Sequence, residues 1–330
     1  MLLNPAIIAL ITGALLIASM LLYATWHGVR ILARWDIGSG SELQLSLERR
    51  TYLISTILSY TMAFQLLSLF LFIYTADSIH GLFTGAMCAA GVLNLNEFGY
   101  PLLIIKIVNF LLAGVWLIIN HADTRGYDYP LIKVKYALLL AIAPLVLVET
   151  YFLFSYFLGL HADVITSCCG SLFSPEKPGF AGDLVSLPAA TMKIAFYSAI
   201  SATTVSGLYF FFKARGGYIF SALAFFTFLI AVASLISFIC LYFYEIPTHH
   251  CPFCILQKEY GYVGYALYLT LLGGGVAGLG TGVLMPLRSF GSLTRVIPLL
   301  QQKLTAITLI LYLVFTLQVS YRMIFSSFRL

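Results

Sequence analysis

The stretch 218–244 reads YIFSALAFFTFLIAVASLISFICLYFY and contains no charged residue in 27 positions. A transmembrane helix needs about 20 consecutive apolar residues, and a helix satisfies all of its backbone polar groups internally, as lipid requires. The whole chain has the same character, because its 330 residues are 61% hydrophobic and 9% charged. Soluble domains carry roughly 25% charged residues. The sequence therefore predicts an all-α, polytopic integral membrane helical bundle.

The remaining apolar stretches define the predicted number of spans. We count eight candidate transmembrane helices: 5–29, 52–74, 101–119, 136–158, 190–212, 218–244, 260–284 and 304–321. The connections between them are short, so residues 1–330 are expected to form a single transmembrane domain without a soluble one.

Basic residues are unevenly distributed among the connections and predict an orientation. One set of alternate connections holds 12 of the 18 basic residues: Arg30, Arg34, Arg49, Arg50, Arg125, Lys133, Lys135, Lys213, Arg215, Arg288, Arg295 and Lys303. The positive-inside rule makes this set cytoplasmic. Loops 76–100, 159–189 and 245–259 are then extracytoplasmic, and we expect a chain in a membrane such as the bacterial inner membrane.

The cysteines follow this predicted orientation. Cys88 lies in the first outer loop, Cys168 and Cys169 lie in the second, and Cys251 and Cys254 lie in the third. Cysteines on an oxidising face suit disulfide chemistry or metal capture. Structural disulfides that brace the outer loops are an equally open interpretation.

The motif with the most specific chemistry is Cys251-Pro-Phe-Cys254, preceded by His249 and His250. Its spacing brings two sulfurs onto one turn. We expect the motif at the N-terminus of a helix, where the helix dipole stabilises a thiolate and so makes a cysteine reactive. Protonated histidines, and Lys258 one turn further on, would act in the same direction. A static disulfide or a metal site is the alternative.

The run Cys251–Lys258, CPFCILQK, and the helix after it resemble the quinone-facing motif of the DsbB and vitamin K epoxide reductase group. These are membrane thiol oxidoreductases built on a four-helix core. The resemblance implies that Cys251 and Cys254 pass electrons to a quinone. It also implies that two of Cys88, Cys168 and Cys169 form a relay pair, which receives electrons from an extracytoplasmic thioredoxin-like partner. Lys258 would then lie near the quinone.

Three charged residues lie within predicted spans. Lys106, Lys193 and Glu149 fall in the outer halves of three helices. Charges at such depth usually face a bundle interior or a cavity, so the three are predicted to converge on a quinone headgroup or a proton path. Alternatively, each lysine extends to the membrane interface.

Two other cofactors stay open as alternatives. Soft sulfur and imidazole ligands at His249, His250, Cys251 and Cys254 would suit a metal, as in a soft-metal transporter or a non-catalytic membrane subunit. Haem would need paired histidines, for which His27 and His121 are candidates.

The leading hypothesis is a membrane thiol–disulfide oxidoreductase that exchanges electrons between an extracytoplasmic thiol partner and a membrane quinone. The chain contains no phosphate-binding glycine loop and few basic residues, which argues against ATP hydrolysis and nucleic-acid binding. Membrane lipid and other subunits of a complex are the remaining expected partners.

Overall fold

The computed structural model describes residues 3–126, 128–161, 164–166, 173 and 180–329. This part of the chain contains no strand, and eight of its helices are long and apolar enough to cross a membrane. Both the fold class and the predicted number of spans are confirmed. The helices are α1 (Pro5–Arg34), α2 (Glu42–Ser78), α3 (Ala89–Leu93), α4 (Gly99–Asp123), α5 (Ile132–Leu158), α7 (Phe180–Val185), α8 (Ala189–Lys213), α9 (Gly217–Ser234), α10 (Cys240–Tyr244), α11 (Val263–Val283) and α12 (Val296–Phe325).

Several helices are longer than the apolar stretches that predicted them. The span predicted at 52–74 lies within α2, which begins at Glu42 and ends at Ser78. Hydropathy detects only the lipid-compatible part of a helix, whereas the backbone continues through polar turns until a capping residue or a break ends it.

The chain forms two compact units. Unit 1 comprises Met1–Thr75, Asn96–Leu160 and Val283–Leu300, and unit 2 comprises Ala76–Leu95, His161–Gly282 and Gln301–Leu330. The expectation of a single transmembrane domain stays a prediction.

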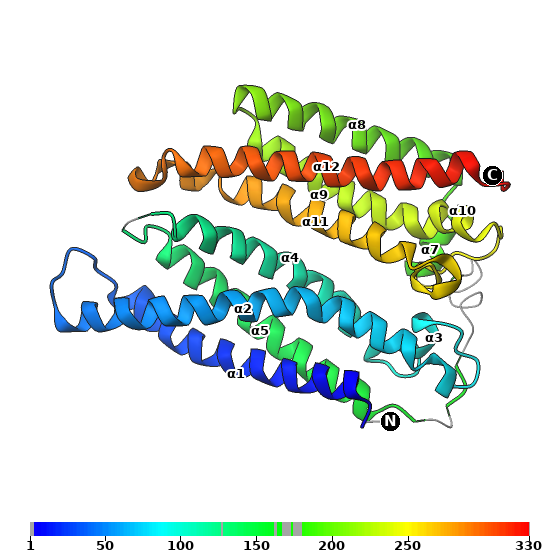
Figure 1. Ribbon diagram of the computed structural model, residues 1–330, viewed down its shortest axis with the longest axis horizontal. Helices are drawn as coiled ribbons and strands as arrows, with labels where there is room; N and C mark the ends of the chain where they lie inside the picture. The colour runs from blue at the N-terminus through cyan, green and yellow to red at the C-terminus, as the bar shows by residue number, and fades with distance from the viewer. Residues whose placement is uncertain (1–2, 127, 162–163, 167–172, 174–179, 330) are drawn as a thin grey trace. The chain divides into compact units, whose positions relative to one another are not determined.

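In unit 1, α1 and α4 both pack against α5, and α2 runs alongside them (Figure 1). Asn4 caps the first turn of α1 by accepting a hydrogen bond from Ala6 N at 2.9 Å, and Pro5 at the first helical position has no amide hydrogen to leave unsatisfied. The core of this unit includes fully buried Leu21, Leu58 and Leu139.

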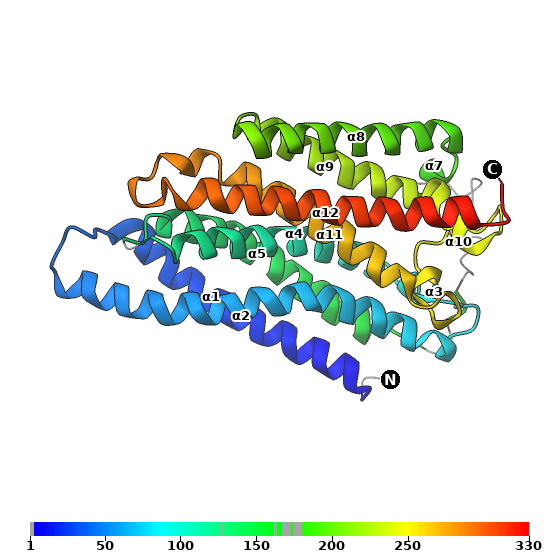
Figure 2. The same cartoon turned by 45° about the horizontal axis from the view of Figure 1, so that its top comes forward.

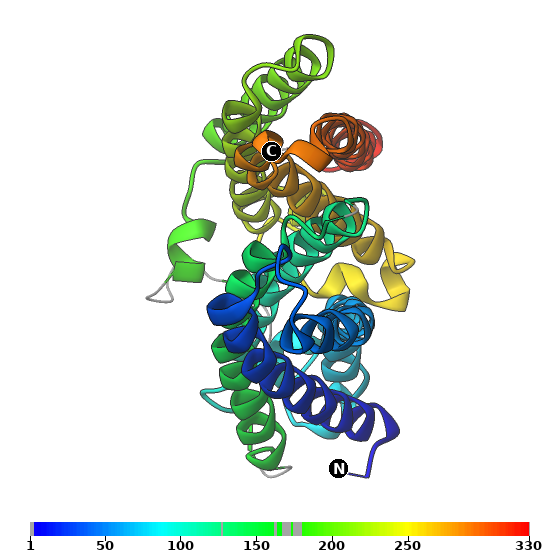
Figure 3. The ribbon, with the colours of Figure 1, turned by 90° about the vertical axis from the view of Figure 1, so that its left-hand side faces the viewer.

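In unit 2, the helices α8, α9, α11 and α12 lie side by side, as Figures 1, 2 and 3 show from three directions. Between α9 and α10, residues Leu235–Ile239 form a π-helical turn, η2, in which Cys240 N donates to Leu235 O. Such wider turns insert a residue into an α-helix and often occur near functional sites.

One face of α11 consists of small residues that let neighbouring helices approach closely. A β-carbon built on Gly278 would lie 2.6 Å from Ala224 Cβ on α9, and one on Gly274 would overlap the ring of Tyr312 on α12. Gly274, Gly278 and Gly282 recur every four residues, which places them on one face of α11 and makes that face a packing surface.

Substitution Gly278→Leu should separate α11 from α9 and lower the melting temperature of the detergent-solubilised protein. Overpacking of this kind costs about 1–3 kcal/mol or more. The matched control is Leu269→Ala on the same helix, because Leu269 is 54% exposed. Equal melting temperatures for the two variants would contradict the packing role.

Candidate thiol site

Three cysteines from distant parts of the sequence meet in unit 2. The sulfurs of Cys88, Cys251 and Cys254 all lie within 4.8 Å of one another, and those of Cys88 and Cys251 are 3.6 Å apart. Cys88 and Cys251 are 0% exposed and Cys254 is 5% exposed. The structure thus brings together three of the five cysteines that the sequence predicts at the site. The other two, Cys168 and Cys169, lie outside the described residues.

The local backbone of the motif differs from the prediction. Cys251 precedes a proline, which disfavours helical geometry at the residue before it, and Cys251 lies in an irregular segment. Cys254–Leu256 forms the single 3₁₀ turn η3, and Lys258–Tyr260 forms a second one, η4.

Helix α11 begins only at Val263. Gly261 and Tyr262 precede it with φ values of +64° and +57°, so two left-handed residues separate α11 from the turns. The prediction that the motif sits at a helix N-terminus is therefore wrong. The motif is held in a buried loop instead, and the dipole of a long helix does not stabilise its thiolates.

Two tyrosine side chains satisfy the main chain of this buried loop. The Tyr244 hydroxyl donates to Cys251 O and accepts from Ile255 N at 2.9 Å, and the Tyr268 hydroxyl donates to Pro252 O. Buried backbone groups without partners are costly, so a buried irregular segment needs such contacts. Sequence reasoning missed both tyrosines, although each is a polar group near the end of an apolar helix.

Aromatic rings close the loop around Tyr244. The ring of His249 lies edge-on to Tyr244 at 4.5 Å, and the Tyr260 ring lies at 4.8 Å. Burial raises the pKa of the Tyr260 phenol, and the neighbouring Cys254 side chain adds to this rise. Tyr260 therefore remains a neutral phenol at physiological pH.

The cysteine contributed by the other loop is positioned by Asp77. Asp77 Oδ1 accepts from Ala89 N at 3.1 Å and from Gln257 Nε2 at 3.2 Å. The same Gln257 amide donates to Met87 O at 2.9 Å. Gln257 thus ties the segment around Cys88 directly to the Cys251–Tyr260 loop. Neither Asp77 nor Gln257 was predicted, since their sequence separation of 180 residues hides the contact.

Thr166 holds the same segment from another side. Its Oγ1 donates to Gly91 O at 2.9 Å, and its amide donates to Thr84 O at 3.1 Å. Gly85 lies against Thr166 O with a φ of +89°, so the close approach requires a residue without a side chain.

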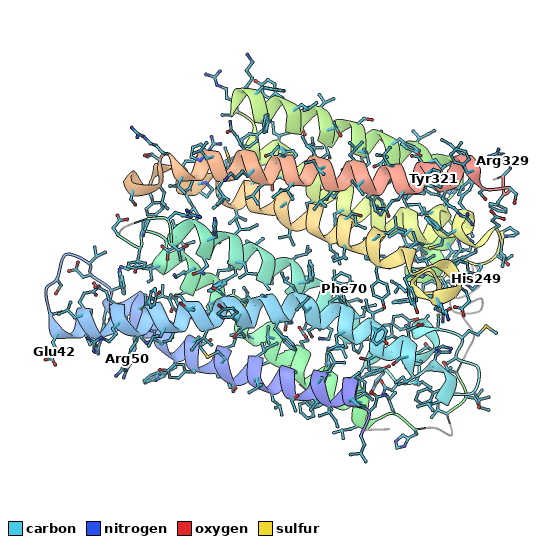
Figure 4. All side chains as sticks on the ribbon, in the orientation of Figure 1. Glu42, Arg50, Phe70, His249, Tyr321 and Arg329 are labelled. Atoms are coloured by element: carbon cyan, nitrogen blue, oxygen red, sulfur yellow. The ribbon has the colours of Figure 1, made fainter. Side chains whose placement is uncertain are left out.

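The two predicted histidines do not join the sulfur cluster. His250 Nδ1 donates to Ile236 O in the π-helical turn at 2.8 Å, which anchors the loop to the span. His249 contacts Tyr244, and Figure 4 shows it beside the loop. Among the described residues, the group of possible metal ligands contains the three cysteines and neither histidine, so the alternative metal set of both histidines with Cys251 and Cys254 stays a prediction. Lys258 is exposed, at the start of η4.

In unit 1, two of the predicted membrane charges form a buried ion pair. Lys106 Nζ lies 2.6 Å from Glu149 Oε1, and Ser68 accepts from the same ammonium at 2.7 Å. Gln65 and Asn109 donate to Glu149 Oε2 at 2.5 and 2.6 Å. Lys106 is 2% exposed, so the alternative in which it extends to the interface is wrong.

The third predicted charge lies in unit 2. Lys193 Nζ donates to Tyr242 Oη at 2.7 Å and is partly buried. The convergence of Lys193 with Lys106 and Glu149 stays a prediction.

The two histidines considered for haem lie on different helices of unit 1, α1 and α4. His27 Nε2 lies 3.3 Å from Thr51 Oγ1, and His121 is exposed in the last turn of α4. A haem site at this pair also stays a prediction.

Comparisons with protein-family models, curated proteins and solved structures found no match for this chain. The geometry of the site therefore carries the functional argument.

Substitution Tyr244→Phe should loosen the thiol loop. It leaves a buried carbonyl and a buried amide without their partner, at a cost of about 1–3 kcal/mol. Maleimide labelling of Cys254 should then become faster than in the wild type. Tyr262→Phe is the control, because Tyr262 is 51% exposed. Equal labelling rates in both variants would refute the role of the Tyr244 hydroxyl in holding the loop.

The ion pair can be tested with a double-mutant cycle. Glu149→Leu and Lys106→Met should each lower stability by about 3–5 kcal/mol, because each strands one buried charge, whereas the double variant should recover most of the loss. Thermal unfolding of all four proteins in one detergent measures the coupling. Additive losses would show that the two side chains do not depend on each other.

Proposed function

We propose that this protein is a membrane thiol–disulfide oxidoreductase that exchanges electrons between an extracytoplasmic thiol partner and a membrane quinone. The observation that supports it most directly is the 3.6 Å contact between the sulfurs of Cys88 and Cys251, with Cys254 within 4.8 Å of both. Thiol–disulfide exchange requires one sulfur to attack a neighbouring one, and three adjacent thiols permit that within one chain.

In this proposal, Cys251 forms a disulfide with Cys88 in one state and with Cys254 in another. A disulfide bond measures about 2.05 Å, so the Cys88–Cys251 contact would shorten by roughly 1.5 Å to form one. Oxidation by quinone converts two thiols into one disulfide, and the two electrons and two protons reduce the quinone to a quinol. In a subsequent exchange, the Cys88 thiolate attacks the Cys251 sulfur of a Cys251–Cys254 disulfide, and Cys254 leaves as a thiolate.

Burial of the cluster decides how a partner can reach it. The Cys88 and Cys251 side chains have no exposed surface, so a soluble protein cannot contact them directly. An external thiol would deliver electrons through a further cysteine pair, for which the adjacent Cys168 and Cys169 are the candidates. The Tyr244 and Tyr268 contacts keep the receiving loop in place during this exchange.

The resemblance of CPFCILQK to the DsbB and vitamin K epoxide reductase group supports the same chemistry. By this resemblance, a quinone is the electron acceptor and Lys258 is the cation beside it. Quinone contacts by Lys106, Lys193 and Glu149, and the extracytoplasmic orientation of the loops in a bacterial inner membrane, are part of this proposal.

Thiol counting tests the proposal in a Cys168→Ser/Cys169→Ser background, which leaves Cys88, Cys240, Cys251 and Cys254. Adding a soluble quinone to the reduced protein should lower the mass-tag count from four to two. Cys251→Ser should abolish this change, because it removes the sulfur common to both proposed disulfides and leaves only Cys88 and Cys254, which do not pair in this proposal. Cys88→Ser and Cys254→Ser should each retain one possible disulfide.

Cys240→Ser is the matched control, since Cys240 is buried in the same unit but lies outside the three-sulfur cluster. It should still lose two thiols on oxidation. A count in the Cys168→Ser/Cys169→Ser protein that never changes with quinone would sink the proposed function and favour a structural role for the cysteines.

A further inference from the structure

The three sulfurs of the cluster form a triangle that approximates a three-coordinate metal site. A metal–sulfur bond of about 2.3 Å in a trigonal plane places its three sulfurs about 4.0 Å apart. The observed separations are 3.6 Å for Cys88–Cys251 and at most 4.8 Å for the other two pairs. Side-chain rotations that move each sulfur by a few tenths of an ångström would close this difference.

The donor set is made of sulfur alone. Within the residues that the structure describes, no histidine nitrogen or carboxylate oxygen joins the cluster. His250 Nδ1 is engaged with Ile236 O, and the Asp77 carboxylate is engaged with the Ala89 amide and Gln257. Thiolate-only sites select soft cations, and hard ions such as Mg²⁺ and Ca²⁺ prefer oxygen ligands.

The coordination number narrows the choice between soft cations. Structural Zn²⁺ sites are almost always tetrahedral with four protein ligands. The described part of the chain offers three, and the site is 0–5% exposed, which leaves little access for water as a fourth ligand. Cu(I) is a soft ion that thiolates select and that accepts low coordination numbers.

The loop is also rigid enough to hold such a geometry. The carbonyls of Cys251 and Pro252 are fixed by Tyr244 and Tyr268, and Gln257 links this loop to the Cys88 segment. Metal sites require ligands whose supporting contacts orient them, and here those contacts come from outside the donor set.

We propose that the reduced Cys88, Cys251 and Cys254 cluster binds one Cu(I) ion through three sulfurs. Each thiol that binds the ion releases its proton to solvent. The site goes beyond the quinone-linked function and does not depend on it. Disulfide formation removes two of the three ligands, so the oxidised protein cannot hold the ion in this way.

The test is a Cu(I) titration of the reduced full-length protein in detergent under anaerobic conditions, with bicinchoninate as competitor. The expected stoichiometry is one Cu(I) ion per chain. The Cys168→Ser/Cys169→Ser variant should bind the same single ion. Cys88→Ala should weaken binding by more than about 100-fold, since losing even an outer-shell partner commonly costs 10–100-fold. Cys240→Ser and His249→Phe, which keeps an aromatic ring against Tyr244, should bind like the wild type.

X-ray absorption of the copper-loaded wild-type protein provides a readout that does not depend on variants folding. A first shell of three sulfurs supports the proposal. Two sulfurs, or any nitrogen ligand, would overturn it, as would unchanged affinity in Cys88→Ala. Because the titration contains no quinone, a negative result leaves the thiol count with quinone as a separate test of the oxidoreductase function.

Discussion

The thiol cluster depends on hydrogen bonds between two tyrosine hydroxyls and an irregular stretch of main chain. Buried backbone polar groups must find partners inside the protein, and a loop cannot supply them as a helix does. The Tyr244 hydroxyl hydrogen-bonds to both ends of the Cys251–Ile255 segment, and the Tyr268 hydroxyl donates to the carbonyl of Pro252 between them. With these contacts, a loop rather than a helix end holds two of the three sulfurs, and Gln257 ties the segment with the third, Cys88, to the same loop.

The same constraint acts on charged side chains in unit 1. Helices α4 and α5 carry two buried pairs, Lys106 with Glu149 and Asp123 with Lys135, each at 2.6 Å. The order of charges is reversed between the two pairs, so an acidic and a basic residue lie on each helix. Such an arrangement favours one register of α4 against α5, because a shift of either helix would strand buried charges. In unit 2, close packing rather than charge sets the position of α11, because Gly274 lies against Tyr312 of α12 and Gly278 lies against Ala224 of α9.

How far the sequence predicted the structure follows from the range of the interactions involved. Eight spans could be predicted because hydropathy is a property of consecutive residues. The Cys-x-x-Cys motif is equally local, and it marks the loop that holds two of the three clustered cysteines. The contact of Cys88 with Cys251 spans 163 residues, and no local pattern pairs Cys88 rather than Cys168 or Cys169 with the motif. Helical geometry at the motif was expected from the apolar run that follows, but Pro252 and the left-handed Gly261 and Tyr262 delay α11. Lys135 counted as a loop charge in the orientation argument, yet it is buried against Asp123.

Cys251 is the member of the cluster common to both disulfides of the proposed exchange. Its sulfur contacts that of Cys88, its sequence neighbour in the motif is Cys254, and its carbonyl is the acceptor for Tyr244. A three-thiol site with one shared member can hold a single disulfide and leave one thiol, or keep three ligands for one ion, but it cannot do both at once. Redox state would therefore decide metal occupancy, and a bound ion would protect the thiols from oxidation. The proposed disulfide and the proposed copper site share two sulfurs, so the affinity for Cu(I) and the reduction potential of the cluster would be thermodynamically linked.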